Sequence, residues 1–364
     1  MDYSSKKIRI KDIAKFSGVS KGTVDRVLHN RKGVSEKSRQ AVEKVLNEMN
    51  YSPNVFARSL ASKKLYRIFC LFPAYQKGDY WENIENGFEQ AAADFENYNV
   101  EILIEYFNQF DSSSFTKVSQ SILEKEPDAI IMAPVFRNET IQFVNQLAEQ
   151  KILFSYIDSM IEETNFLTYY GQHSFQSGYV AAKLLFQTLP ENSTVIITRT
   201  KRRGGAVSNQ TTNRYNGFMK YCEEFQLEKK FNLLKIEIED DNEKANFQLF
   251  KNIFSQYSNV SAAITFNSKV YRLANYLSLL NKTDIIILGY DVLEKNVTFL
   301  KQGIISYLIA QRPEKQAYFS IRDMCCELIF KKPINKINYV PIDILIKENV
   351  DYYINFSKYE ASLF

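Results

Sequence analysis

The side chains that could do chemistry are unevenly distributed along this 364-residue chain, and basic groups dominate one end. Residues 1–64 hold 15 Lys and Arg against 6 Asp and Glu, a net charge of +9, whereas the remaining residues hold 31 against 36. A small basic segment attached to a mildly acidic body is typical of a nucleic-acid-binding module carried by a second domain. Binding to phosphate, rather than catalysis, is therefore the first chemistry that the sequence indicates.

Groups suited to catalysis are scarce. The chain has two histidines, His29 and His173, and the first lies in the basic segment. There is no GxGxxG, GxxxxGK[ST] or GxSxG motif and no spacing typical of metal ligands. We therefore expect no enzyme, no cofactor and no metal site, although paired carboxylates leave acid–base chemistry open.

The cysteines and the hydropathy pattern bear on the cellular compartment of the protein. Its four cysteines show no CxxC spacing, which fits a reduced setting. Residues Met1–Ile10 are polar and charged, and no run of about 18 apolar residues occurs. We expect a cytoplasmic protein that does not contact a membrane.

The basic segment has the pattern of a helix-turn-helix. Between Lys11 and Asn47 its apolar residues recur at helical spacing in three short blocks. Such a motif needs a small residue where the two helices cross, a glycine that turns the chain and apolar residues on the inner face of the second helix. Ala14, Gly18, Val24 and Val27 supply these in order.

The second of these helices would carry the groups that face DNA. Ser20 can cap it, and Lys21, Gly22 and Arg26 would then face the major groove. The alternative is an ordinary helical hairpin with a solvated basic face. The separation of charge along the chain favours the DNA-binding interpretation.

Beyond Leu65 short β-rich runs alternate with amphipathic stretches of helical length, which predicts βαβ units and parallel sheets. The ten predicted strands exceed one comfortable sheet, so we expect two doubly wound lobes that share a ligand-binding cleft at the carboxyl ends of the strands. The predicted strands are Tyr66–Pro73, Val100–Phe107, Asp128–Pro134, Ile152–Ile157, Thr194–Arg199, Asn232–Ile238, Val260–Phe266, Asp284–Tyr290, Ile304–Ala310 and Asn338–Ile346.

The stretch from Ile10 to Leu60 resembles the DNA-binding headpiece of the lac repressor family. The matching residues are Lys11-Asp12-Ile13-Ala14, Gly18-Val19-Ser20, Thr23-Val24, Arg26-Val27-Leu28, Val34-Ser35, Arg39, Tyr51-Ser52-Pro53-Asn54 and Ala57-Arg58-Ser59-Leu60. The resemblance implies a homodimer on a pseudo-palindromic operator, a hinge helix over Asn54–Ser62 and a leucine, Leu60, that wedges into the minor groove. The DNA-binding set that it implies is Arg9, Ser20, Lys21, Gly22, Thr23, Asp25, Arg26, Asn54, Ala57 and Leu60.

Three positions depart from the family pattern. Arg9 stands where members often have a threonine that caps the first helix, and it could contact a phosphate instead. Asp25 replaces a serine, which costs affinity unless Asp25 orients Arg26 or accepts a hydrogen bond from a cytosine amine. Gly22 cannot read a base edge, so specificity is expected to depend on Lys21 and Arg26.

The rest of the chain resembles the two-lobed, periplasmic-binding-protein-like core that this family uses as a sensor. The resemblance rests on the blocks Asn213-Arg214-Tyr215-Asn216-Gly217-Phe218, Thr265-Phe266-Asn267, Leu288-Gly289-Tyr290-Asp291 and Ala310-Gln311-Arg312-Pro313. By this resemblance Arg214, Asn267, Asp291 and Gln311 contact the ligand, and Asp158 does so from the first lobe. Carboxylates, a carboxamide and a guanidinium suit the hydroxyls of a carbohydrate.

Some of these side chains have a simpler alternative role. An Asp or Asn at the end of a strand is often a helix cap, and Trp81, the chain's one tryptophan, would be either a stacking partner for a sugar, with Tyr75 and Tyr80 nearby, or part of the core. Arg199, Arg202 and Arg203 form a basic loop that could meet an anionic ligand, although a solvated loop is favoured.

We therefore predict an all-α headpiece over residues 1–52, a hinge helix and linker over 53–64, a ligand-binding and dimerisation domain over 65–354, and a tail over 355–364. A solute-binding protein of the transport type is the alternative, but it would need a signal peptide in place of the basic segment. The tail has no heptad of leucines, which favours a dimer over a tetramer.

Overall fold

The computed structural model divides the chain into two compact units, with the boundary between Lys63 and Lys64. The structure describes residues 10–28, 31–49, 64–201, 208–239 and 242–362. The predicted boundaries at 52/53 and 64/65, and the hinge helix over Asn54–Ser62, fall in or beside a segment outside the described residues.

The described residues of the first unit form a bundle of three helices, α1 (Ile10–Ser17), α2 (Lys21–Leu28) and α3 (Glu36–Glu48). Its small core is formed by Ile13 and Ala14 of α1, Val24 and Val27 of α2, and Val42 and Val45 of α3. Each helix contributes one apolar stripe, as the helical spacing predicts, so an all-α headpiece is confirmed.

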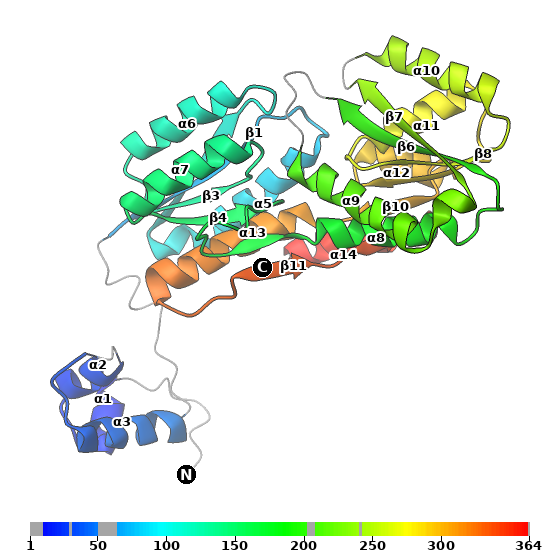
Figure 1. The fold of residues 1–364 in the computed structure, drawn as a ribbon. Helices are drawn as coiled ribbons and strands as arrows, with labels where there is room; N and C mark the ends of the chain where they lie inside the picture. Colours follow the sequence, from blue (N-terminus) through cyan, green and yellow to red (C-terminus); the bar gives the residue numbers. More distant parts are fainter. Residues whose placement is uncertain (1–9, 29–30, 50–63, 202–207, 240–241, 363–364) are drawn as a thin grey trace. The chain divides into compact units, whose positions relative to one another are not determined.

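The second unit has two lobes. The first contains a six-stranded parallel sheet of order β11-β5-β4-β3-β1-β2 (Figure 1). Its strands are β1 (Tyr66–Pro73), β2 (Val100–Phe107), β3 (Ala129–Met132), β4 (Leu153–Ile157), β5 (Tyr169–Gln172) and β11 (Ile337–Val340). Its helices are α5 (Tyr80–Phe95), α6 (Ser112–Glu124), α7 (Arg137–Glu149) and α13 (Pro313–Cys325).

The second lobe repeats this plan with a sheet of order β12-β10-β9-β8-β6-β7, in which only the short β12 is antiparallel to its neighbour. Its strands are β6 (Thr194–Lys201), β7 (Asn232–Glu239), β8 (Val260–Thr265), β9 (Ile286–Tyr290), β10 (Tyr307–Ala310) and β12 (Asp343–Leu345). Its helices are α8 (Ser174–Phe186), α9 (Asn209–Glu224), α10 (Glu243–Gln256), α11 (Val270–Leu279), α12 (Glu294–Lys301) and α14 (Val350–Ser362).

Helices cover both faces of each sheet, so the central strands are buried on both sides. In β1, for example, Ile68 and Cys70 belong to the cluster shared with α5 and α13, whereas Phe69 and Leu71 belong to the cluster shared with α6 and α7. Two doubly wound lobes, as predicted, are therefore confirmed.

The chain passes between the lobes three times, after β5, after β10 and after β11. One side chain joins all three passages. The Gln172 amide at the end of β5 donates to the carbonyl oxygen of Ala310 at 2.8 Å and to that of Pro341 at 3.2 Å. Gln172 is buried, so these bonds do not compete with solvent.

The structure corrects two expectations about strands and one about the tail. The single strand predicted over Asn338–Ile346 is wrong: it is interrupted at Pro341 and forms β11 in one sheet and β12 in the other. The strand β5 was not predicted, because it has only four residues and ends in Gly171 and Gln172. The boundary predicted at 354/355 falls inside α14.

Helix α8, which follows the passage after β5, packs against α9 with very close backbone contact. A methyl group on Gly217 of α9 would overlap the carbonyl group of Phe175, and one on Gly178 of α8 would overlap that of Arg214. The glycines therefore set the separation of the two helices, and with it the position of the side chains at the start of α9.

We expect Gly217→Ala to lower the stability of the protein by roughly 1–3 kcal/mol, because the added methyl group must displace backbone. In a helix without such a contact the same change would stabilise by about 1 kcal/mol. The sign of the change in melting temperature, measured by calorimetry, separates the two cases. Asn216→Ala on the same helix is the control, and a Gly217→Ala protein that melts higher than wild type would contradict the close contact.

Candidate functional site

The first candidate site is the outer face of the helix-turn-helix. Gly18 has a φ of +68°, which lets the chain turn between α1 and α2. The Ser20 hydroxyl caps α2, because it accepts a hydrogen bond from the Thr23 amide at 3.1 Å. With Val24 and Val27 buried, Lys21, Gly22 and Arg26 are exposed on the opposite side.

The structure shows the surroundings of two positions that depart from the family pattern, Asp25 and Gly22. Asp25 accepts a hydrogen bond from the Arg31 guanidinium at 3.3 Å, an ion pair that connects the recognition helix to the segment after it. A Cβ atom on Gly22 would meet only the Ser20 hydroxyl, at 3.8 Å, so packing within this unit does not require a glycine there. The predicted DNA contacts Arg9, Asn54, Ala57 and Leu60 lie outside the described residues.

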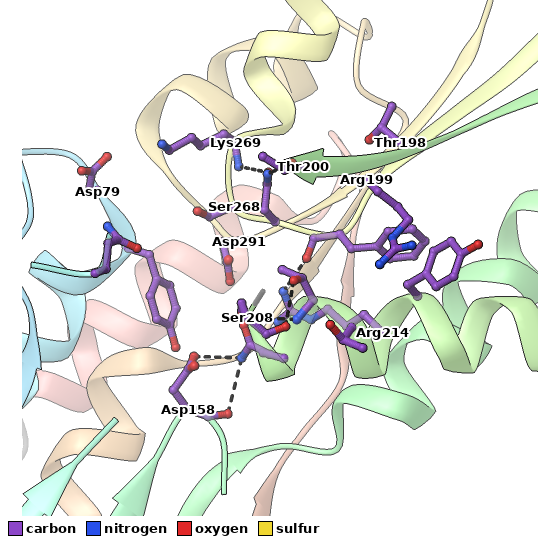
Figure 2. A pocket seen from close by; sticks show the side chains of 18 of the residues that line it. Asp79, Asp158, Thr198, Arg199, Thr200, Ser208, Arg214, Ser268, Lys269 and Asp291 are labelled. Atoms are coloured by element: carbon purple, nitrogen blue, oxygen red, sulfur yellow. Dashed lines mark hydrogen bonds between the residues drawn. The ribbon is translucent and has the colours of Figure 1, made fainter. Parts of the chain in front are cut away.

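The second candidate site is a cavity of about 200 Å³ lined by both lobes of the second unit (Figure 2). The first lobe contributes the residues that follow β1, β2 and β4, and the second lobe contributes the ends of β6, β8 and β9 and the start of α9. The lining residues are Asp79, Tyr80, Trp81, Gln109, Asp158, Thr198, Arg199, Thr200, Ser208, Gln210, Thr211, Thr212, Arg214, Tyr215, Glu237, Phe266, Asn267, Ser268, Lys269 and Asp291.

Asp158 and Asp291 occupy equivalent places in the two lobes. Each directly follows a strand, β4 or β9, and each has a left-handed backbone, with φ values of 67° and 72°. Each amide donates to the neighbouring strand, Asp158 to Tyr170 at 3.0 Å and Asp291 to Ile309 at 3.0 Å. The two carboxylates are thereby presented to the same cavity from opposite lobes.

Both carboxylates are buried, at 7% and 4% exposure. Burial raises the pKa of Asp158 to about 6, and it also raises the pKa of Asp291. The Arg214 guanidinium acts in the opposite direction on the pKa of both acids. These raised pKa values show that the carboxylates are poorly solvated and only partly compensated by the protein.

Arg214 lies at 1% exposure near the start of α9, between these groups (Figure 2). Its guanidinium carbon lies 3.9 Å from the centre of the Tyr290 ring, and Nη1 donates to the Phe266 carbonyl at 3.0 Å. Nε and Nη2 have no hydrogen-bond partner among the described residues. A buried guanidinium with two unused donors beside two buried carboxylates is suited to a polar ligand.

The other predicted ligand contacts, Asn267, Gln311 and Trp81, differ in how they relate to the cavity. Asn267 lines the cavity, donates to the Thr200 hydroxyl at 2.7 Å and accepts from the Lys269 amide at 2.9 Å, so it also closes a local turn before α11, whose cap position is Lys269. Gln311 does not line the cavity. Its side-chain amide donates to Oδ1 of Asp291 at 2.8 Å. Trp81 lines the cavity and also stacks on Phe72, with ring centres 6.3 Å apart.

Two side chains of this cavity were not among the predicted ligand contacts, although Tyr80 was expected near Trp81. The Tyr80 hydroxyl is buried near Asp158 without hydrogen-bond geometry to any described residue, and burial together with the two carboxylates raises the pKa of Tyr80 well above its ordinary value. It therefore remains a donor. Gln210 bonds directly to Asp158. Their positions at the first turns of α5 and α9, immediately after strands β1 and β6, are the signal that could have found them. Tyr75, in contrast, bonds to Glu85 at 2.7 Å.

Other kinds of site find no support in the part of the chain that the structure describes. No three His, Cys, Asp or Glu side chains there are grouped so that they could hold a metal ion. Among the described helices, none has the length and apolar character needed to cross a membrane.

Comparison with known proteins assigns each unit to a family. Residues 69–332 match the model of the periplasmic binding protein domain, and residues 9–54 match that of bacterial regulatory proteins of the lacI family. Among curated proteins, the transcriptional regulator MalR of Streptococcus pneumoniae is 24% identical over 289 residues, covering 78% of this chain and 83% of MalR. The regulator TreR of Salmonella typhimurium is 52% identical over 54 residues, 15% of this chain and 17% of TreR.

Solved structures agree with the sequence relatives. A putative LacI transcriptional regulator from Bacteroides fragilis is 38% identical, covers 80% of this chain and all of its own, and superimposes with a TM-score of 0.75. The glucose-galactose binding protein GanP of Geobacillus stearothermophilus shares the fold at 19% identity and a TM-score of 0.66, covering 79% of this chain and 99% of its own.

Asp158→Asn should make the protein more stable at neutral pH, because the mutation removes a buried charge. With a folded pKa of about 6 and an ordinary pKa near 3.8, wild type binds more protons when folded, so its stability falls as pH rises from about 4 to 6. Above pH 6 the Asp158 carboxylate is ionised in the folded protein, and the loss of stability from burying its charge reaches up to about 3 kcal/mol. Melting curves between pH 3.5 and 7.5 should converge at the acid end, and an Asp158→Asn protein that is less stable at pH 7 would contradict the interpretation.

Proposed function

Because this chain belongs to the lacI family of bacterial regulatory proteins, we propose that its helix-turn-helix reads an operator through α2 and that the inter-lobe cavity binds the effector. The chain is a DNA-binding transcriptional regulator whose operator binding is controlled by a small ligand. What remains to be tested is which residues carry these two roles, and which ligand is bound.

The operator-reading role is supported by the exposure of Lys21, Gly22 and Arg26 on one face of a capped helix. Thr23 and Asp25 lie between Gly22 and Arg26 on the same helix, and Ser20 caps its start. We infer that the protein acts as a homodimer in the cytoplasm, on a pseudo-palindromic site whose half-sites lie roughly 10 base pairs apart. The charge of residues 1–64, doubled in a dimer, supports binding that weakens steeply with salt.

The observation that carries the effector-binding role is the buried Arg214 with two unused donors between Asp158 and Asp291. These groups bring hydrogen-bond donors and acceptors together in one cavity. Each hydroxyl of a polyhydroxylated ligand can use both kinds of partner. The partly buried face of Trp81 and the hydroxyls of Thr200, Ser208 and Ser268 extend the set. A sugar or sugar derivative is therefore the proposed effector, held by Trp81, Asp158, Arg214, Asn267 and Asp291, with Gln311 supporting Asp291.

Two alternatives are weaker. Among the described residues, no serine or threonine hydroxyl of the cavity is hydrogen-bonded to a carboxylate or a histidine, so we infer no catalytic role for them. A transport-type solute-binding protein would use the same two lobes, but it has no need of a helix-turn-helix that exposes a basic face. A thermal-shift screen over mono- and disaccharides and sugar acids would identify the effector, since a ligand of the folded state raises its melting temperature.

Arg26→Ala should cost on the order of 1–3 kcal/mol per half-site and relax the preference for particular bases, because a residue that reads a base edge discriminates between sequences. Titrations against operators with single base changes would measure this. Lys6→Ala is the comparison and should weaken binding to all sequences about equally. An equal loss for every operator in the Arg26→Ala protein would assign Arg26 to backbone positioning.

Arg214→Ala and Asp291→Asn should abolish the response to the effector while leaving operator binding intact, because both residues belong to the sensor unit. Calorimetry with the sugar that the screen identifies would measure the loss of affinity directly. Lys220→Ala on α9, which lies outside the cavity, is the control. Unchanged affinity in both variants would remove Arg214 and Asp291 from the binding site.

A further inference from the structure

Three buried glutamines form a hydrogen-bonded circuit beside the cavity, and one of them, Gln210, lines it. Gln210 lies on α9 of the second lobe, Gln311 lies in the passage after β10, and Gln316 lies on α13, which packs on the first lobe. Their exposures are 7%, 1% and 0%. Amide side chains at this depth need partners for both donor and acceptor atoms, so the circuit is a defined arrangement rather than a set of incidental contacts.

Gln210 makes the link between the lobes. Its amide nitrogen donates to Oδ1 of Asp158 at 2.8 Å and to Oε1 of Gln311 at 2.8 Å. The first of these bonds runs from the second lobe to a carboxylate of the first, and it is among the dashed lines at Asp158 in Figure 2. Both protons of the amide are therefore used, one on each side of the cleft.

The circuit closes through the passage between the lobes. Gln316 donates to the carbonyl oxygen of Gln311 at 2.7 Å, and its own Oε1 accepts from the Asp158 amide at 3.1 Å. Gln311 also donates to Asp291 at 2.8 Å. The two carboxylates that face the cavity are thus connected to each other through neutral amides only.

Capping of α9 does not explain Gln210. Ser208 occupies the cap position of that helix, where its hydroxyl faces the Thr211 amide at 3.5 Å. Gln210 instead lies on the side of the helix that lines the cavity. Its contacts with Asp158 and Gln311 are therefore the feature that needs a role.

We propose that Gln210 is a positioning residue that links the two lobes across the cavity and orients Asp158 for the effector. The inference rests on the proposed effector site. A hydrogen bond between a buried amide and a buried carboxylate is worth enough to shift a closed-to-open ratio by roughly 10- to 100-fold. By favouring the closed arrangement, Gln210 keeps the polar groups of the cavity in place for the effector.

The chain carries its own reporter of closure, because Trp81 is the single tryptophan and lines the same cavity. Full-length protein without effector would be studied by Trp81 emission and by quenching with acrylamide, which reaches the indole more readily when the cleft opens. We expect Gln210→Ala to shift the emission to longer wavelength and to increase the quenching constant. Gln210→Glu, which keeps the shape but places a carboxylate against Asp158, should do so more strongly.

Asn213→Ala is the matched control, because Asn213 is exposed on the same helix and does not line the cavity, so its change should leave Trp81 as in wild type. Melting curves and circular dichroism confirm that each variant is folded. Unchanged quenching in both folded Gln210 variants, or the same increase in Asn213→Ala, would overturn the proposal. Operator binding by wild type is measured separately, so a protein that binds no operator would refute the proposed function without deciding the role of Gln210.

Discussion

The structure of the sensor depends on one buried positive charge. A guanidinium at 1% exposure is costly unless acidic groups and hydrogen bonds compensate it, and Arg214 obtains only part of this from Phe266 and Tyr290. Asp158 and Asp291 add an electrostatic attraction, but their raised pKa values indicate that this attraction does not offset the cost of burying the two carboxylates. A ligand that supplies the missing hydrogen bonds therefore binds where the protein itself leaves polar groups unsatisfied.

The two lobes hold this charge because they are built on the same plan. Asp158 corresponds to Asp291, because each donates its amide to the neighbouring strand, at Tyr170 or at Ile309, and Gln172 and Gln311 each lie two residues after that acceptor. Each glutamine lies at a passage between the lobes: Gln172 donates to the carbonyl oxygen of Ala310, and Gln311 accepts from Gln210. In each lobe this local arrangement pairs a carboxylate that faces the ligand cavity with a carboxamide at the end of the neighbouring strand that helps to connect the lobes.

Much of this was predictable, and the exceptions have physical causes. The strands β1 and β2 have the predicted bounds because their runs end at turn-forming residues, and the acids that follow β4 and β9 could be found because the family resemblance points to acids directly after these two predicted strands. Sequence does not show that Gln311 lies behind Asp291, or that Gln210 reaches Asp158, because those contacts join segments 20 and 52 residues apart. Pro341 could have indicated the break between β11 and β12.

Asp158 belongs to two networks at once, and this gives a physical route from the cavity to the arrangement of the lobes. One of its oxygens accepts from Gln210, while its backbone amide donates to Gln316 and Tyr170. A ligand hydroxyl that bonds to the same carboxylate changes how strongly it holds Gln210, and by reciprocity the closed arrangement changes how strongly the ligand is held. Because the intermediate groups are neutral amides, this coupling depends on hydrogen-bond geometry rather than on long-range charge, and salt should affect it far less than it affects the contacts with DNA.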